Sequence, residues 1–236
     1  MDNCCNTYNS VAAGVGDQLY DGWVHSHRAC DCRYRVDSRL FSEEMRGIKL
    51  CPLVPLKEEA AKAKAEVLED KASAKGSKTL PTPAEIITKP QAQSVDPIGE
   101  EPLDDAITCL ARTIYWETNR KDDAEMEAIA NVVMNRLGQK GFPKTICGVV
   151  KQGHKQGACQ FSWWCDGRSD DAKEDEAYSH SKEIARKALN RQLKDRSDGA
   201  LYFHHRKVTP NWSNEYIKTV EVGEHVFYKP AGDKAK

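Results

Sequence analysis

Glu117 is the acidic residue whose position best suits acid catalysis. It lies in LARTIYWETN (110–119), where Leu110 and Ile114 belong to the apolar stripe of a predicted amphipathic helix. At about 100° per residue, Glu117 lies roughly 20° around the helix axis from Leu110 and roughly 60° from Ile114. Partial burial at this edge would raise the pKa of the carboxyl and retain the proton of a general acid. The alternative is an ordinary boundary glutamate that reaches for water or Arg120.

Two later segments contain residues suited to binding a sugar, CQFSWWCDG (159–167) and YFHHRKVTPNW (202–212). Aromatic rings offer flat apolar faces to sugar rings, and polar side chains between them offer hydrogen bonds to hydroxyl and acetamido groups. The alternatives are aromatic residues that fill the core beneath a long loop, and a surface histidine pair. The candidate substrate-binding residues are Gln160, Ser162, Trp164, Asp166, Tyr202, His204 and Trp212.

The nine cysteines do not have the spacing of a metal site. The sequence has no HExxH motif and no CxxC pair, so we expect neither a metal nor a cofactor. Cys159 and Cys165 either close a short disulfide loop or are buried thiols. A nucleophile formed by Cys165 or Cys109 with His204 is a weaker alternative. Because the count is odd, at least one cysteine lies outside any intramolecular pairing.

Charge and hydropathy exclude several classes of partner. Lys and Arg number 35 and Asp and Glu 36, so the net charge of −1 gives no reason to expect binding to nucleic acid or an anionic membrane. The uncharged apolar runs are shorter than a membrane span. The first twenty residues lack the features of a secretory signal, so we expect synthesis in a cytoplasm, where thiols normally stay reduced.

The 236 residues are expected to form three parts. Residues 1–53 would be an irregular Cys-rich module, and 103–230 a catalytic domain. Between them, residues 54–102 would be a linker, because 56–75 favour an exposed helical spacer and the prolines and glycines of 76–102 favour extended backbone.

The periodicity of the C-terminal part predicts helices followed by a small antiparallel sheet, an α+β fold. Asp122 and Glu125 have capping-box spacing, Pro143 is placed to open a short helix, and Gly223-Glu224 would turn a hairpin. Helices are expected near 104–119, 122–137, 143–150 and 172–193, and strands near 200–205, 219–222 and 225–228.

Six blocks in order resemble the cell wall hydrolase family named for the spore-cortex-lytic enzyme SleB. The resemblance implies a lysozyme-like domain that cleaves the glycan strands of peptidoglycan, with Glu117 as the catalytic acid. Where the family usually has Ala-Arg-Gly-Glu after this glutamate, the sequence has Thr-Asn-Arg-Lys (118–121), so the family's second glutamate is missing. The blocks are LARTIYWETN (110–119), AIANVVMNR (128–136), FPKTICGVVKQ (142–152), CQFSWWCDG (159–167), ALYFHH with VTPNW (200–212) and VGEHVFYK (222–229).

A single acid favours the lytic transglycosylase reaction, because hydrolysis by glycosidases normally uses two carboxyl groups. Asp166 is the best candidate for a second one. We expect Ser162, Gln160 or Tyr202 to hold the acetamido group or the developing charge. Trp164 and Trp212 would line the sugar groove, and His204 would orient its loop.

Without a secretory signal, an enzyme of this class would reach the cell wall with the help of a bacteriophage. It would be a lysis-time endolysin, or a virion component whose residues 1–53 dock on tail or baseplate proteins. The competing hypothesis is a structural virion protein with a catalytically idle hydrolase domain, cross-linked through its cysteines.

Overall fold

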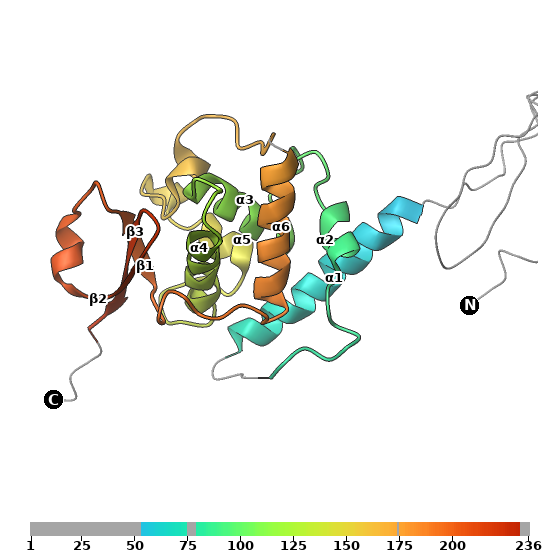
Figure 1. The fold of residues 1–236 in the computed structure, drawn as a ribbon, viewed down its shortest axis with the longest axis horizontal. Coiled ribbons are helices and arrows are strands. Elements are labelled where there is room, and N and C mark those ends of the chain that lie inside the picture. The colour runs from blue at the N-terminus through green and yellow to red at the C-terminus, as the bar shows by residue number, and fades with distance from the viewer. Residues whose placement is uncertain (1–52, 75–78, 174, 232–236) are drawn as a thin grey trace, which may run out of the picture. The chain divides into compact units, whose positions relative to one another are not determined.

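The structure is a computed structural model that describes residues 53–74, 79–173 and 175–231 (Figure 1). The module expected at 1–53 lies outside the described residues except for residue 53. The described residues belong to one compact unit. The helices are α1 (Leu53–Ser73), α2 (Lys89–Ser94), α3 (Ala106–Glu117), α4 (Asp123–Arg136), α5 (Ile146–Val150) and α6 (Asp175–Leu189), with short 3-10 helices η1 (His154–Gln156), η2 (Ser162–Cys165) and η3 (Asn211–Asn214). The strands are β1 (Tyr202–His205), β2 (Tyr216–Val222) and β3 (His225–Pro230).

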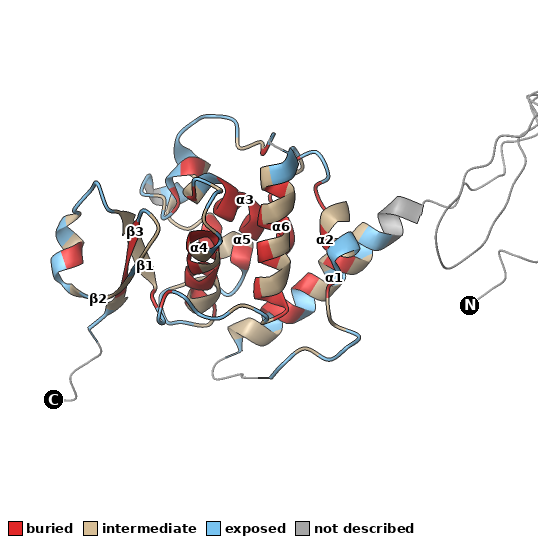
Figure 2. Ribbon diagram, viewed as in Figure 1, coloured by how far each residue is buried: buried red, intermediate tan, exposed pale blue. Residues whose placement is uncertain are grey.

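Helix α3 lies in the middle of the helical part. Every residue from Ala106 to Tyr115 is buried, and α3 packs against α4, α5 and α6. Asp105 fixes its start, because the carboxylate accepts hydrogen bonds from the backbone N–H groups of Ile107 (2.9 Å) and Thr108 (3.0 Å). Figure 2 shows buried positions along α3, α4 and α6. The helix predicted over 104–119 is confirmed, and it ends at Glu117.

The helix predicted over 56–75 is confirmed by α1, but one face of this helix is buried in the core and is not exposed to solvent. Ala61, Ala65 and Leu68 are buried in the same core as α3, and so are Ile87 and Val95 of the following segment. The expectation of an exposed spacer and an extended linker is therefore wrong for the described residues. The small alanine side chains let α1 lie close to its neighbours, which a composition argument does not reveal. The division of the chain at residues 53 and 102 stays a prediction.

A buried ion pair attaches this segment to the helices. The Arg112 guanidinium of α3 lies 2.8 Å from the Asp96 carboxylate, and Tyr178 of α6 donates a hydrogen bond of 2.5 Å to the same oxygen. Burial opposes the charged form, but the hydrogen bonds from Tyr178, the Glu101 N–H and Arg112 keep the pKa of Asp96 below its usual range. Lys182 of α6 adds hydrogen bonds to the carbonyls of Val95 and Asp96. These contacts join residues 95–101 to α3 and α6.

The strands form an antiparallel sheet in the order β1-β3-β2. The predicted hairpin joins β2 to β3, and Phe203 of β1 is opposite Phe227 of β3. Phe227 is buried against Ala128, Ile129 and Val132 of α4, so one face of the sheet packs on this helix. The α+β fold is confirmed, with the sheet at one end of the helices (Figure 1).

Glu125 of α4 holds the hairpin. Asp122 caps α4 as predicted, but Glu125 does not complete a capping box, since its Oε1 accepts hydrogen bonds from Glu224 N (2.6 Å) and His225 Nδ1 (2.9 Å). Gly223 has φ of 55°, and a Cβ added there would lie 2.5 Å from Glu125 Oε1. The turn therefore requires glycine for both its backbone angle and its close approach to α4.

Helix α5 begins later than predicted. Thr145 is its N-cap, because its hydroxyl accepts a hydrogen bond of 3.1 Å from Gly148 N. The prediction that Pro143 occupies the first helical position is wrong, since a better cap follows two residues later.

Two disulfides join the four cysteines of the C-terminal half. Cys109 pairs with Cys147, which links α3 to α5, and Cys159 pairs with Cys165 around η2. The short loop is one of the two predicted alternatives, whereas the first pair was not predicted. A disulfide sulfur is no thiolate, so the alternative of a nucleophile at Cys109 or Cys165 is wrong.

Among the described helices, none combines the length and apolar character needed to cross a bilayer.

Candidate active site

Glu117 is the last residue of α3, and its side chain is partly buried. Its position follows from the stripe of α3, which buries the preceding Ile114 and Tyr115 completely or nearly so. No hydrogen-bond donor of the described residues reaches the carboxyl. Burial raises the pKa of Glu117 to about 7, and the positive charge of Arg136 acts in the opposite direction. The group therefore holds a proton in a large fraction of molecules near neutral pH, as a general acid requires.

Arg136, the last residue of α4, is the charged partner of Glu117. It is 2% exposed, and its Nε donates a hydrogen bond of 2.8 Å to the carbonyl of Leu201, just before β1. Burial lowers its pKa to about 10, while Tyr202 and Glu117 act to raise it. Its Nη1 is buried and has no hydrogen-bond partner in the described part of the chain. The guanidinium thus remains charged at neutral pH, and the N–H donors of its Nη1 are unused.

Three aromatic rings surround that guanidinium. Its central carbon lies 5.1 Å from the ring centre of Phe161, 5.2 Å from that of Phe142 and 5.8 Å from that of Tyr202. These distances are typical of cation–π contacts, which favour a cation in a partly desolvated place. Arg136 therefore connects Glu117 to the two segments that were predicted to bind a sugar.

The structure brings Tyr202, His204 and Trp212 together on the sheet. The ring of Trp212 lies 6.0 Å from that of Tyr202 and 5.7 Å from that of His204. Tyr216 stacks on Tyr202 at 4.7 Å, and the Tyr228 hydroxyl lies 3.1 Å from His204 Nε2. All five side chains lie near one another on and beside the sheet, and Tyr202 is the member that reaches Arg136.

The loop 159–167 is held through Phe161, which is fully buried and lies against Arg136. Trp164 is partly buried, with the Lys151 ammonium 5.1 Å from its ring centre. Gln160, Ser162 and Asp166 are exposed. No contact in the described residues joins these four predicted site residues directly to Glu117. The loop thus borders the site, with Phe161 rather than its neighbours in contact with Arg136.

No second carboxyl of the described residues acts on Glu117. The Asp166 carboxylate accepts a hydrogen bond of 2.9 Å from the Arg168 N–H within its own exposed loop. In the part of the chain that the structure describes, Arg136 is the charged group that acts on Glu117, and it lowers the pKa that burial raises. Likewise, the described residues contain no cluster of three or more His, Cys, Asp or Glu side chains that would hold a metal ion.

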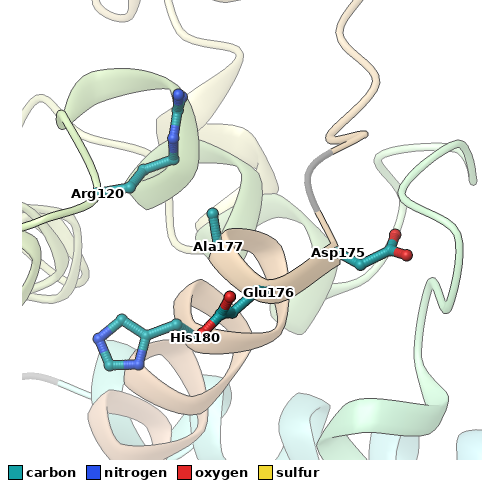
Figure 3. Close-up of a pocket in the computed structure, with 5 residues that line it drawn as sticks. All are labelled: Arg120, Asp175, Glu176, Ala177 and His180. Carbon is teal, nitrogen blue, oxygen red and sulfur yellow. The ribbon is translucent and has the colours of Figure 1, made fainter.

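A shallow pocket of about 510 Å³ is lined by other residues (Figure 3). Its lining comes from Arg120 after α3 and from the first turns of α6, where Asp175, Glu176 and His180 lie. The His180 ring nitrogen is 2.8 Å from Asp123 at the start of α4. None of the predicted site residues lines this pocket.

The main residue that the sequence argument missed is Arg136. An arginine in the last turn of a helix is ordinarily explained by the helix dipole, so its position gave no functional signal. Phe142, Tyr216 and Tyr228 were also missed, whereas the alternative of an aromatic residue that fills the core beneath the loop is confirmed for Phe161. The signal available for them was their position within or beside the aromatic segments.

Comparison with known proteins bears on the same region. Residues 120–228 match the family model described as Cell Wall Hydrolase, so Glu117 lies three residues before the matched segment. The spore cortex-lytic enzyme of Halalkalibacterium halodurans is 28% identical over 129 residues, which cover 52% of this chain and 34% of that protein. The spore cortex-lytic enzyme of Bacillus subtilis is 28% identical over 126 residues, 51% of this chain and 36% of that protein. The chain thus spans about a third of the length of these relatives.

Two solved structures are also similar. The catalytic domain of the Bacillus cereus SleB protein gives a TM-score of 0.43 with 25% identity, over 52% of this chain and 89% of that one. The catalytic domain of the germination-specific lytic transglycosylase SleB from Bacillus anthracis gives a TM-score of 0.42 with 23% identity, over 52% and 93%. Residues 120–228 thus match the Cell Wall Hydrolase family model, and about half of this chain is similar to the spore cortex-lytic enzymes.

Proposed function

We propose that this domain cleaves the glycan strands of peptidoglycan, with Glu117 as its single catalytic acid. The observation that carries the proposal is the partly buried carboxyl at the end of α3, whose pKa burial raises to about 7. The family description and the names of the curated relatives support a cell wall substrate. The aromatic side chains around Tyr202 and Trp212 support a sugar as the ligand.

The reaction that fits one acid is a lytic transglycosylation. Glu117 donates its proton to the glycosidic oxygen as the bond from that oxygen to the anomeric carbon breaks. The resulting carboxylate takes the proton of the C6 hydroxyl of the same muramoyl residue, whose oxygen bonds to the anomeric carbon. Glu117 ends protonated again, no water is consumed, and the nucleophile is held by its own sugar ring. Hydrolysis would normally need a second carboxyl, and among the described residues no other carboxylate acts on Glu117.

The remaining site residues have proposed binding roles. Trp212 and Trp164 would stack on sugar rings, and His204 would hold the strand end through its hydrogen bond with the Tyr228 hydroxyl. Gln160, Ser162 and Asp166, on the exposed loop, would contact sugar hydroxyl groups.

Purified wild-type protein and Glu117→Gln, compared on peptidoglycan sacculi with mass analysis of the fragments, test this function. We expect wild type to release fragments with 1,6-anhydromuramoyl ends and the variant to release none. Glu215→Gln, at an exposed glutamate, is the matched control and should behave as wild type. Reducing ends would indicate hydrolysis instead. No release by either the wild type or the Glu117→Gln variant would favour an idle structural domain.

Delivery by a phage particle is a further part of this proposal. The disulfides of the described domain use four of the nine cysteines, and the other five lie in residues 1–51. An odd number there leaves at least one cysteine for a bond to another chain or for a free thiol. Non-reducing gels of intact particles would reveal a cross-linked species if residues 1–53 dock covalently, and a band at the size of the single chain would contradict such a bond.

A further inference from the structure

One hydrogen-bond donor of the candidate site, Nη1 of Arg136, has no partner within the described part of the protein. Arg136 Nη1 is buried without a partner among the described residues, although Nε of the same guanidinium is satisfied by the Leu201 carbonyl. A buried donor of a charged group that lacks an acceptor costs free energy, so native proteins rarely contain one that has no role. The Glu117 carboxyl, which acts electrostatically on Arg136, forms no ion pair within 4 Å in the described part of the chain, and its pKa of about 7 keeps it protonated in a large fraction of molecules.

The surroundings of Nη1 define what it would accept. The rings of Phe142, Phe161 and Tyr202 lie around the guanidinium and offer apolar faces. Phe142 and Tyr202 are only partly buried, so this place is bounded by side chains that reach the surface. A ligand group that suits Nη1 and these rings has a strong neutral hydrogen-bond acceptor for the donor and a small apolar part for the rings. The acetamido group of an aminosugar has both, in its carbonyl oxygen and its methyl group.

We propose that Arg136 is a substrate-contacting residue of this domain, whose Nη1 donates a hydrogen bond to the acetamido carbonyl of the aminosugar bound next to Glu117. This inference rests on the proposed function and names the group through which the substrate is recognised. The positive charge also stabilises the carboxylate that Glu117 becomes after it donates its proton. The titratable groups that face Arg136 are Glu117 from α3 and Tyr202 from β1, and Tyr216 of β2 acts on Tyr202.

The test compares wild type, Arg136→Gln and Arg136→Lys on intact sacculi and on sacculi whose sugars have been de-N-acetylated, with re-acetylated sacculi as the substrate control. Wild type should prefer the acetylated substrate. Arg136→Gln should lose about tenfold to a hundredfold in kcat/KM on that substrate, the effect of one hydrogen bond to a charged donor. On the de-N-acetylated substrate the variant should lose much less, so its preference for the acetyl group should shrink.

Further readouts separate a substrate contact from a purely structural role. Without the positive charge, the alkaline limb of the pH–rate profile should move to higher pH in Arg136→Gln, while Arg136→Lys should keep the limb near its wild-type position. Arg196→Gln, which removes an ion pair with Glu127 elsewhere on α4, is the matched control and should change neither readout. Thermal unfolding identifies any variant that fails to fold. If Arg136→Gln fails to fold, Arg136→Lys decides alone: a smaller preference for the acetylated substrate than that of wild type supports the contact, and an unchanged preference contradicts it.

The outcomes are distinct. If wild type does not cleave sacculi, the proposed function fails. If wild type cleaves and Arg136→Gln retains the full acetyl preference and the wild-type pH profile, the function stands and the role of Arg136 is refuted.

Discussion

Replacing Glu117 with glutamine should stabilise the folded protein at alkaline pH, although it removes the proposed acid. The pKa of Glu117 is raised from 4.5 to about 7 by burial. In the unfolded chain the carboxyl loses its proton near the lower value, whereas in the folded protein it retains it up to the higher value. The unfolded state therefore binds fewer protons between these values, and the wild-type free energy of unfolding falls as pH rises through this window.

The size of the effect follows from the shift. A difference of one pKa unit corresponds to about 1.4 kcal/mol, so ionising Glu117 in the folded protein costs about 3 kcal/mol. Glutamine has a similar shape and does not ionise. The stability of Glu117→Gln minus that of wild type should therefore rise by about 3 kcal/mol from pH 4 to pH 8, and the effects of all other groups cancel in this difference.

Urea unfolding of both proteins at several pH values, with disulfides intact, measures the difference directly. The Glu215→Gln variant, at an exposed glutamate, is the control for the loss of one carboxyl group from the chain. A flat difference for Glu117→Gln would show that the carboxyl has an ordinary pKa, and would refute the argument that burial on α3 prepares it as an acid.

Three other substitutions test the packing and the binding surface. Changing both Cys109 and Cys147 to alanine removes a disulfide that joins residues 38 positions apart. The free energy of unfolding measured by urea titration should fall by about 4 kcal/mol, and an unchanged unfolding midpoint would contradict a formed disulfide. Ala65→Glu should cost at least about 2 kcal/mol because it places a charge in the core, whereas an exposed spacer helix would tolerate it. Trp212→Ala should raise KM for sacculi about tenfold, and an unaltered KM would exclude Trp212 from the sugar-binding surface.

Periodicity predicted the elements that carry the candidate site. The stripe of α3 was strong enough to place Glu117 at its edge, and alternation of apolar residues around Gly223 predicted the hairpin that the structure contains. These features are local, because each depends on residues within a few turns of helix or one strand pair.

Long-range partners were beyond this reasoning. Residues 54–102 look like a linker by composition, yet Asp96 finds Arg112 and Tyr178 only after the chain has folded back on α3 and α6. Cys109 and Cys147 lie on different helices, and no spacing rule connects them. Arg136 is similar, since its partners come from α3, the loop after α4 and β1, and its role depends on all three.

The central claim is that Glu117 acts as a single acid and that the C6 hydroxyl, not water, attacks the anomeric carbon. The most direct test is cleavage of sacculi in water labelled with a heavy oxygen isotope. The released muramoyl ends should contain no label, because their own C6 oxygen closes the ring and Glu117 only transfers protons. One labelled oxygen at each new end would mean that water attacks the anomeric carbon, and would contradict the mechanism proposed for Glu117.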